Sequence, residues 1–155
     1  MQESDLNLWL FKSEPDAYSI DDLKRDRRAP WDGIRNYQAR NMLRDDTRVG
    51  DRVLFYHSSC AEPAVVGIAR IASKPYPDPS QFDPESKYHD PKSTPEAPRW
   101  LLVDLAFERK LRRPITLAEL KEHPALGEFR LNHRGNRLSI FPVDREHWDL
   151  VLGLE

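Results

Sequence analysis

Apolar and polar positions alternate along several stretches of the chain, and this period-two pattern predicts β-strands. In "LNLWLFKS", Leu8 and Leu10 are expected on one face, with Trp9 and Phe11 on the other. Gly67 interrupts a later apolar run, which predicts a β-bulge or the close approach of another element. Beyond the first, strands are expected within "GDRVLFYHS" (50–58), "PAVVGIARIASKPY" (63–76), "RWLLVDLAFERKL" (99–111) and "RLSIFPV" (137–143).

Capping residues and helical periodicity predict four helices between these strands. A capping box begins at Ser19, Asn36 can cap the next helix, and Thr116 with Glu119 forms a second box. Asp144 precedes the last helix. The helices are expected at 19–26, 37–45, 116–123 and 145–153.

Strands that cluster together with helices at their margins predict an α+β fold, in one domain covering residues 1–155. Five or more such strands can curl into a partly closed barrel whose ends the helices cover. Residues 75–98 hold seven of the thirteen prolines, so a long ordered or semi-ordered loop is expected there. Loops of this length inside a compact domain are usually functional or mobile.

The composition is that of a globular protein, with 39% hydrophobic and 32% charged residues. A single cysteine, Cys60, excludes an internal disulfide and a cysteine-based zinc cluster, and no metal or cofactor is expected. The acidic N-terminus is not typical of a signal peptide, and no apolar run approaches the roughly 20 residues that span a bilayer. We therefore expect no membrane association and a cytoplasmic protein, or a nuclear one if the source is eukaryotic.

The net charge of −2 argues against a protein that coats nucleic acid, yet the basic residues gather in three islands. Solvated helix faces and turns would explain them, and so would a rim that follows phosphates around a site. The first island comprises Lys24, Arg25, Arg27, Arg28, Arg35, Arg40, Arg44 and Arg48; the second comprises Arg109, Lys110, Arg112 and Arg113; the third comprises Arg130, Arg134 and Arg137.

The stretch "WDGIRNYQARN" (31–41) concentrates flat and hydrogen-bonding side chains around one glycine. Aromatic faces stack on nucleobases, and amides can match a base edge because they both donate and accept. Trp31, Asn36, Tyr37 and Gln38 supply these groups, with Arg35 and Arg40 placed to take flanking phosphates. In the alternative interpretation Trp31 only plugs a barrel end and Asn36 only caps a helix. The first interpretation predicts that Trp31→Ala keeps the fold and lowers the affinity for a ligand at least tenfold, about 1.4 kcal/mol, whereas the alternative predicts unfolding.

Catalytic motifs are missing: the chain has no glycine-rich phosphate loop, no H-E-x-x-H and no G-x-S-x-G. A nucleophile pair of His57 and Cys60 stays open, beside the simpler view that Cys60 packs as a small hydrophobe. Glu14 and Asp104 are carboxylates on different predicted strands, and the sequence does not establish that they meet.

Four motifs together resemble the EVE-domain family, at similar order and spacing: "WLFKSEP", "WDGIRNYQARN", "GDRVLFYHS" and "RLSIFPV". The resemblance covers the chain from Leu8 to Leu152. It implies a PUA-like fold, which is a curled mixed β-barrel with helices covering its openings. Relatives in that superfamily, such as YTH and ASCH domains, bind or act on nucleic acids. EVE domains are thought to recognise modified bases, notably modified cytosines in DNA and also RNA, by flipping one base into a pocket.

The resemblance also implies which residues form that pocket. Trp31 would be a stacking wall, Asn36 would read a base edge, and Ser13 or Ser58 would add a hydrogen bond. Trp9 and Trp148 are expected in the core, with Trp100 an outside candidate for the site. The implied base-binding residues are Lys12, Ser13, Glu14, Trp31, Arg35, Asn36, Tyr37, Tyr56, His57 and Ser58; Arg137 and Arg40 would bind phosphate, and Leu138 and Ser139 complete the last segment.

The sequence is compatible with three functions. The first is a binding module, without catalysis, for DNA or RNA that carries a modified cytosine-type base; we expect a monomer whose effector protein is encoded separately. The second is an enzyme acting on a nucleotide or small heterocycle, which needs a proton-transfer group such as Glu14, His57, Cys60 or Asp104. The third, suggested weakly by the proline-rich loop, is a domain that binds a peptide.

Overall fold

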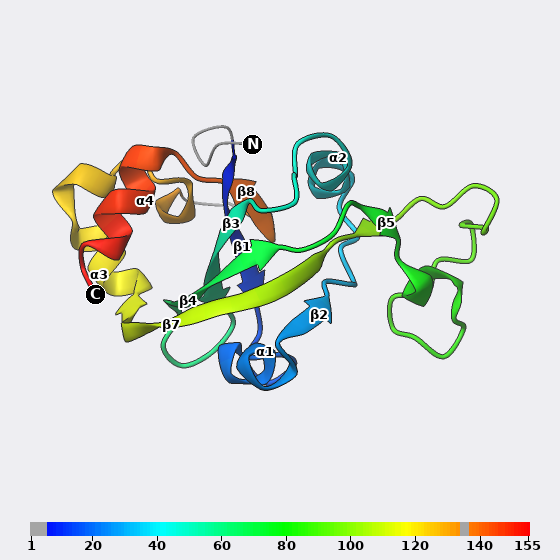
Figure 1. Cartoon of the computed structure of the whole chain (residues 1–155), viewed down its shortest axis with the longest axis horizontal. Helices are drawn as coiled ribbons and strands as arrows, with labels where there is room; N and C mark the ends of the chain where they lie inside the picture. The colour runs from blue at the N-terminus through cyan, green and yellow to red at the C-terminus, as the bar shows by residue number, and fades with distance from the viewer. Residues whose placement is uncertain (1–5, 134–136) are drawn as a thin grey trace.

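The computed structural model describes residues 6–133 and 137–155, and its main feature is a curled six-stranded mixed sheet (Figure 1). The strand order is β2-β7-β4-β3-β1-β8; β1 pairs with β3 in parallel, and the other neighbours are antiparallel. The strands are β1 (Leu8–Ser13), β2 (Arg28–Pro30), β3 (Arg52–His57), β4 (Ala64–Ile71), β7 (Asp104–Thr116) and β8 (Ile140–Pro142). A separate two-stranded ribbon pairs β5 (Tyr76–Pro77) with β6 (Leu101–Leu102).

Four α-helices occur within the described residues: α1 (Ile20–Asp26), α2 (Tyr37–Asp45), α3 (Leu117–Glu122) and α4 (Arg145–Leu152). In Figure 1, α3 and α4 lie at one end of the curled sheet, and the excursion after β5 extends beyond the other end. The predicted α+β fold, a curled mixed sheet with helices at its openings, is confirmed. No helix of the described ranges is long and apolar enough to cross a membrane.

The helix caps follow the sequence prediction with two differences. The capping box at Ser19 is complete, and Asn36 Oδ1 accepts from the amide of Ala39 at 2.9 Å. Thr116 caps α3, but the Glu119 carboxylate pairs with Arg113 and so does not close a capping box. Asp144 stands at the N-cap position of α4 without a side-chain capping bond.

The core lies on both faces of the sheet, and the residues of β1 divide between the two faces as their alternation predicts. Leu8 and Leu10 of β1 join one cluster, which includes Trp148 of α4. Trp9 and Phe11 join the other. Trp9 and Trp148 are each only 1% exposed, so their predicted core positions are confirmed.

Gly67 marks a close approach of α1 to the sheet. A Cβ atom at this position would lie 2.6 Å from Ile20 Cδ1 and 3.0 Å from the carbonyl oxygen of Arg109. The register between β4 and β7 shifts beside this residue, between Val65 and Gly67. Both parts of the prediction for Gly67 are therefore confirmed, and the missing side chain allows the start of α1 to pack on β4.

Three strand boundaries differ from the sequence prediction. β2 was not predicted as a strand, because a three-residue edge strand is too short to show alternation. The expected strand 99–111 is broken at Val103, whose carbonyl accepts from the amide of Trp31 at 2.9 Å, and β7 then runs on to Thr116. β8 is shorter than the expected 137–143.

Candidate functional site

A cavity of about 550 Å³ opens at the end of β1, between the loop after β2 and the long excursion after β5. Aromatic rings form part of its wall, and charged and hydroxyl groups form the rest. The aromatic lining residues are Tyr18, Trp31 and Tyr88; the polar ones are Lys12, Ser13, Glu14, Asp32, Lys87 and Ser139. Ala17, Ala29, Pro30, Gly33 and Ile34 complete the lining.

Trp31 belongs both to the core and to the cavity wall. Its side chain is 9% exposed, and its ring centroid lies 5.4 Å from that of Phe55, 6.0 Å from Tyr18 and 6.2 Å from Phe11. These rings meet at tilted or edge-on angles, as is usual for aromatic clusters in cores. The indole therefore fills one end of the sheet and also borders an open space, so Trp31 is more than a core plug.

The end of β1 and the turn after it bring Tyr18 to the cavity. The Glu14 carbonyl accepts from the amides of Ala17 and Tyr18, both at 2.9 Å, and Ser13 Oγ donates to the Tyr18 carbonyl. The Tyr18 hydroxyl donates to Asp26 at 2.8 Å. Burial raises the pKa of this hydroxyl, and the hydrogen bond to Asp26 adds to the shift, so Tyr18 stays neutral. The turn thus presents a fixed phenol ring edge-on to Trp31.

Two charged groups of the lining have shifted pKa values. Burial lowers the pKa of Lys12, whose Nζ atom lies 5.9 Å from the centre of the Phe141 ring. Partial burial raises the pKa of Asp32, and the nearby Asp78 carboxylate raises it further. The cavity therefore disfavours the charged forms of Lys12 and Asp32. A ligand that offers a matching polar partner would stabilise those charged forms.

The far wall of the cavity comes from the excursion, through Lys87 and Tyr88. The Tyr88 ring packs so tightly on Gly33 that a Cβ there would lie 2.6 Å from Tyr88 Cζ. Gly33 also has a φ of +84°, a backbone conformation that side chains disfavour. Glycine is therefore required at this position on two independent grounds.

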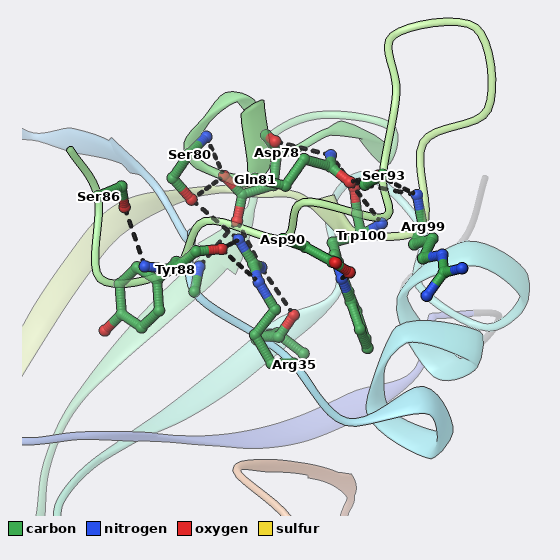
Figure 2. A network of polar contacts seen from close by, with 12 residues as sticks. Arg35, Asp78, Ser80, Gln81, Ser86, Tyr88, Asp90, Ser93, Arg99 and Trp100 are labelled. Atoms are coloured by element: carbon green, nitrogen blue, oxygen red, sulfur yellow. Dashed lines mark hydrogen bonds and ion pairs between the residues drawn. The ribbon is translucent and has the colours of Figure 1, made fainter. Parts of the chain in front are cut away.

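Arg35 and Asp78 attach this wall to the rest of the domain (Figure 2). Arg35 Nη1 lies 3.0 Å from Asp78 Oδ2, and Arg35 Nε and Nη2 both donate to the Tyr88 carbonyl, at 3.0 and 2.8 Å. The guanidinium carbon lies 5.5 Å from the ring centres of both Tyr88 and Trp100. Arg35 therefore holds Tyr88 in place and does not itself line the cavity.

Asp78 is fully buried and is satisfied by several donors. It accepts from the Gly33 amide at 2.8 Å and from the amide and hydroxyl of Ser80 at 2.9 and 2.6 Å. Desolvation alone would raise the pKa of Asp78, but these hydrogen bonds and the Arg35 guanidinium outweigh it and lower that pKa. The carboxylate is thus stably ionised and ties the loop before α2 to the excursion.

Gln81 braces the interior of the excursion (Figure 2). Its Nε2 donates to the carbonyls of Asp78 and Trp100, at 2.7 and 2.8 Å. Its Oε1 accepts from Ser93 Oγ at 2.6 Å and from the amide of Trp100 at 3.0 Å. The proline-rich loop is consequently an ordered structure held by buried polar groups.

Several residues of the stretch 31–41 lie at the start of α2, outside the cavity lining. Asn36 uses its side-chain oxygen to cap α2. Tyr37 stacks on Trp100 with ring centres 4.7 Å apart. The Arg40 guanidinium lies over the Tyr37 ring and donates to the carbonyl of Arg99 at 2.7 Å. Their contacts give these residues structural roles, and the expectation that Asn36 and Tyr37 meet a base inside the cavity does not match the lining.

The third predicted segment also lies outside the lining. Tyr56 is buried in the opposite core cluster, where desolvation raises its pKa to about 12. His57 Nε2 accepts from the Ile20 amide at 3.1 Å, and burial lowers its pKa, so the neutral ring serves as a cap for α1. The Ser58 amide donates to the Ser13 carbonyl at 2.9 Å and holds the end of β1. None of the three lines the cavity.

Within the described ranges, seven basic residues of the islands form ion pairs with neighbouring acids, as the simpler interpretation expects, and Arg35 with Asp78 is one of these pairs. Arg137 is exposed, two residues before the cavity residue Ser139. Arg134 lies outside the described residues. The other pairs are Arg25 with Asp22 and Asp26, Arg28 with Asp104, Arg44 with Asp45, Arg109 with Glu155, Lys110 with Asp21, and Arg113 with Glu119.

Sequence reasoning missed Tyr18, Asp32, Lys87 and Tyr88 as site residues. Asp32 lies within the stretch 31–41 and is a polar residue next to Trp31 in the sequence. Lys87 and Tyr88 carry no local signal, because their place at the cavity depends on how the excursion folds back. In residues 6–133 and 137–155, no three His, Cys, Asp or Glu side chains are grouped so that they could hold a metal ion.

A curled mixed sheet with an aromatic and polar cavity at one strand end defines a PUA-like domain. Residues 7–154 match the EVE domain, and the chain belongs to this family. It is 42% identical over 165 residues to thymocyte nuclear protein 1 of Homo sapiens, covering 95% of this chain and 73% of that protein.

Solved structures agree with this assignment. A crystal structure of a Pseudomonas syringae protein has a TM-score of 0.91 at 47% identity, covering 95% of this chain and 98% of the other. Human THYN1, crystallised in complex with DNA containing 5-methylcytosine, has a TM-score of 0.90 at 41% identity, with 96% of each chain covered. An ASCH protein variant from Zymomonas mobilis, at 12% identity and a TM-score of 0.54, shows a likeness of fold alone.

Proposed function

We propose that this protein binds nucleic acid and holds one modified base of the cytosine type, turned out of the stack, in the cavity lined by Trp31. The observation that carries the proposal is this cavity, found in a chain similar over 96% of its length to human THYN1, which was crystallised with DNA containing 5-methylcytosine. The lining suits such a ligand, because a heterocycle stacks on aromatic side chains and forms hydrogen bonds with polar groups at its edge.

The size of the cavity suits this occupant. Its volume of about 550 Å³ lies within the 300–1,000 Å³ of typical ligand pockets. Drawing one base from the stack costs a few kcal/mol, and stacking on an aromatic side chain returns about 1–3 kcal/mol per base. Tyr18, Trp31 and Tyr88 provide aromatic surface, and edge hydrogen bonds must supply the remainder.

Five lining residues and the residues around them have roles in this proposal. Trp31 and Tyr88 are the walls between which the base is held, and Lys12 and Ser13 contact its edge, with Glu14 close to the same end of β1. Arg40 and Arg137 remain proposed phosphate contacts on the surrounding surface. Arg35, Asn36, Tyr37, Tyr56, His57 and Ser58, which do not line the cavity, are proposed to position its walls.

The test is the affinity of the protein for two oligonucleotides that differ only in one 5-methyl group on a cytosine. Measurements at a fixed salt concentration of about 150 mM keep the phosphate contribution the same for both. We expect the methylated oligonucleotide to bind at least tenfold more tightly. Equal and weak affinity for the two would contradict the proposal.

The alternative of an enzyme needs a proton-transfer group at the site. Of the four residues considered for it, Glu14 lines the cavity, whereas His57 accepts from a backbone amide, Cys60 donates to a carbonyl, and Asp104 pairs with Arg28. Full turnover of a nucleotide substrate by Glu14→Gln would remove this base. The binding proposal draws its support from a relative crystallised with DNA, and the catalytic alternative has no comparable support.

We also propose that the protein acts as a cytoplasmic or nuclear monomer and that a separately encoded effector protein responds to the bound base. A recognition domain of this kind changes nothing by itself, which is the reason for including an effector. Light scattering of the protein with and without a methylated oligonucleotide would test the monomer: a mass that corresponds to two chains would contradict it.

A further inference from the structure

Asp32 is a cavity residue to which no role has been assigned so far. Its side chain is exposed to solvent yet lines the cavity beside the indole of Trp31. Apart from its own backbone amide, no described residue donates a hydrogen bond to its carboxylate or forms an ion pair with it. The neighbouring carboxylate Asp78, in contrast, is fully engaged with Arg35, Ser80 and Gly33.

The backbone on both sides of Asp32 is held in place. On one side, the Trp31 amide donates to the Val103 carbonyl at 2.9 Å. On the other side, the Gly33 amide donates to Asp78 Oδ2 at 2.8 Å. The Tyr88 ring packs so closely on Gly33 that a Cβ atom added there would lie 2.6 Å from Tyr88 Cζ. A short side chain that leaves such a fixed backbone has few positions to adopt, and the carboxylate is therefore presented at the cavity.

A flat ring that enters the cavity removes water from Asp32. Removing water from a carboxylate without supplying a hydrogen-bond donor costs free energy. Partial burial and the nearby Asp78 carboxylate already raise the pKa of Asp32. Lys87 also lines the cavity and is near enough to offset part of the charge, but it is exposed to solvent and lies against the Tyr88 ring at 5.0 Å. A ligand that brings an N–H group to Asp32 would offset this cost.

We propose that Asp32 is the specificity-determining residue that accepts a hydrogen bond from the exocyclic amino group of the bound base, an assignment that rests on the proposed function. The cavity would then take 4-amino pyrimidines and reject 4-oxo pyrimidines. Cytosine presents an amino donor at this position, where thymine presents a carbonyl acceptor, and acidic side chains pair with that amino group. An ionised carboxylate can only accept, so opposite a carbonyl both groups stay unsatisfied and repel one another.

Glu14 is the competing carboxylate, because it also lines the cavity. It is exposed, has one more rotatable bond, and follows the end of β1, where its carbonyl accepts from Ala17 and Tyr18. Asp32, in contrast, is next to both the stacking wall and the glycine that seats Tyr88. The fixed backbone on both sides of Asp32 favours it as the group that faces the ring edge.

The experiment compares two single-stranded oligonucleotides that carry either 5-methylcytosine or thymine at one position. The two bases share the methyl group and differ in the amino and oxo edge, and single strands remove any difference in unpairing. The wild type is expected to prefer 5-methylcytosine at least tenfold. In Asp32→Asn the amide can donate to the thymine carbonyl, so the preference is expected to fall to within about twofold. A ratio of affinities also cancels the general gain from removing one negative charge near phosphates.

Two further variants complete the design. Glu62→Gln removes an exposed carboxylate outside the cavity lining and is expected to keep the wild-type ratio. Glu14→Gln identifies which carboxylate reads the base: if it abolishes the preference and Asp32→Asn does not, the assignment to Asp32 is overturned. The assignment is also overturned if Asp32→Asn, with an unchanged melting temperature, retains the tenfold preference.

Failure of the underlying function would look different. An oligonucleotide with an abasic site at the same position serves as the reference. Equal affinity of the wild type for the abasic and methylated strands would contradict base binding itself. Tighter binding of both 5-methylcytosine and thymine than of the abasic strand, with no difference between them, would leave base binding intact and refute the role of Asp32.

Discussion

The two walls of the cavity are built in different ways. The Trp31 wall is part of the apolar core, where the indole packs against Phe11 and Phe55 of the sheet. The Tyr88 wall belongs to a long excursion that is held by polar groups, chiefly Arg35 and Asp78. The comparison indicates that one wall cannot be altered without disturbing the fold, whereas the other can be moved or removed while the sheet stays intact.

Trp31→Ala should have the largest effect on stability. Truncating a core aromatic residue typically lowers the free energy of unfolding by about 3–5 kcal/mol, and the 9% exposure of Trp31 places it in that class. Urea denaturation would measure the loss. A decrease below about 1 kcal/mol would mean that the indole is a wall without a core role, and the distinction between the two walls would fail.

Asp78→Ala should come next, with its effect confined to the second wall. The variant leaves Arg35, whose side chain is 21% exposed, without its carboxylate and removes the acceptor of the Gly33 amide. Breaking a largely buried pair in this way is expected to cost about 2–3 kcal/mol. Hydrogen exchange should show faster exchange in residues 79–100 and unchanged protection in β1 and β3. Uniform loss of protection over the sheet would contradict a separately held wall.

Gly33→Ala tests the junction between the two walls. A methyl group at this position meets the Tyr88 ring at 2.6 Å, on a backbone with φ of +84°, so we expect a loss of about 1–3 kcal/mol and weaker base binding. Gly127→Ala is the matched control, because nothing lies within 4 Å of its added methyl group. Similar effects of the two substitutions would argue against the close contact with Tyr88.

Tyr88→Ala should separate binding from folding. The ring is only partly buried and belongs to the excursion, so the free energy of unfolding should change by about 1 kcal/mol or less. Affinity for a methylated oligonucleotide should fall about tenfold, because one stacking surface is lost. Anisotropy titrations and urea denaturation on the same preparation would check both. Unchanged affinity would exclude Tyr88 from the binding surface.

The smallest expected effect is a change of stability with pH that His57 causes. Burial lowers the pKa of His57 below its ordinary 6.5, so its contribution to stability is present above pH 6.5 and is lost as the pH falls through the folded-state pKa. The reason is that a protonated Nε2 cannot accept from the Ile20 amide. The nearby Asp21 and Lys110 charges act in opposite directions on this group.

Unfolding free energies at pH 7.5 and 5.5 would test this for the wild type and for His57→Gln. The wild type should lose more stability on acidification than the variant, whose amide does not titrate. Equal losses in the two proteins would show that another group causes the acid sensitivity.

The sequence predicted the two regions with unequal success. The four helices, the main strands and the close approach at Gly67 carry local signals in periodicity and capping, and the structure contains them. In the first strand, Leu8 and Leu10 were expected on the face opposite to Trp9 and Phe11, and the two pairs join different core clusters. The short strands β2, β5 and β6 were missed, since two or three residues are too few to show a period.

The site was predicted where it depends on contiguous residues and missed where it depends on folding back. Lys12, Ser13, Glu14 and Trp31 were expected at the site and line the cavity. Tyr88 reaches it only because Arg35 binds its carbonyl across 53 residues of sequence, and no local pattern encodes that contact. Conversely, Asn36 and Tyr37 have side chains suited to a base, but the start of α2 engages them in a cap and a stack on Trp100.

A crystal structure of this protein with an oligonucleotide that carries one 5-methylcytosine tests the central claim most directly. The account predicts that the methylated base leaves the stack and lies in the cavity between Trp31 and Tyr88, with its amino group toward Asp32. A complex in which that base remains stacked in the nucleic acid and the protein contacts it with another surface would contradict the account.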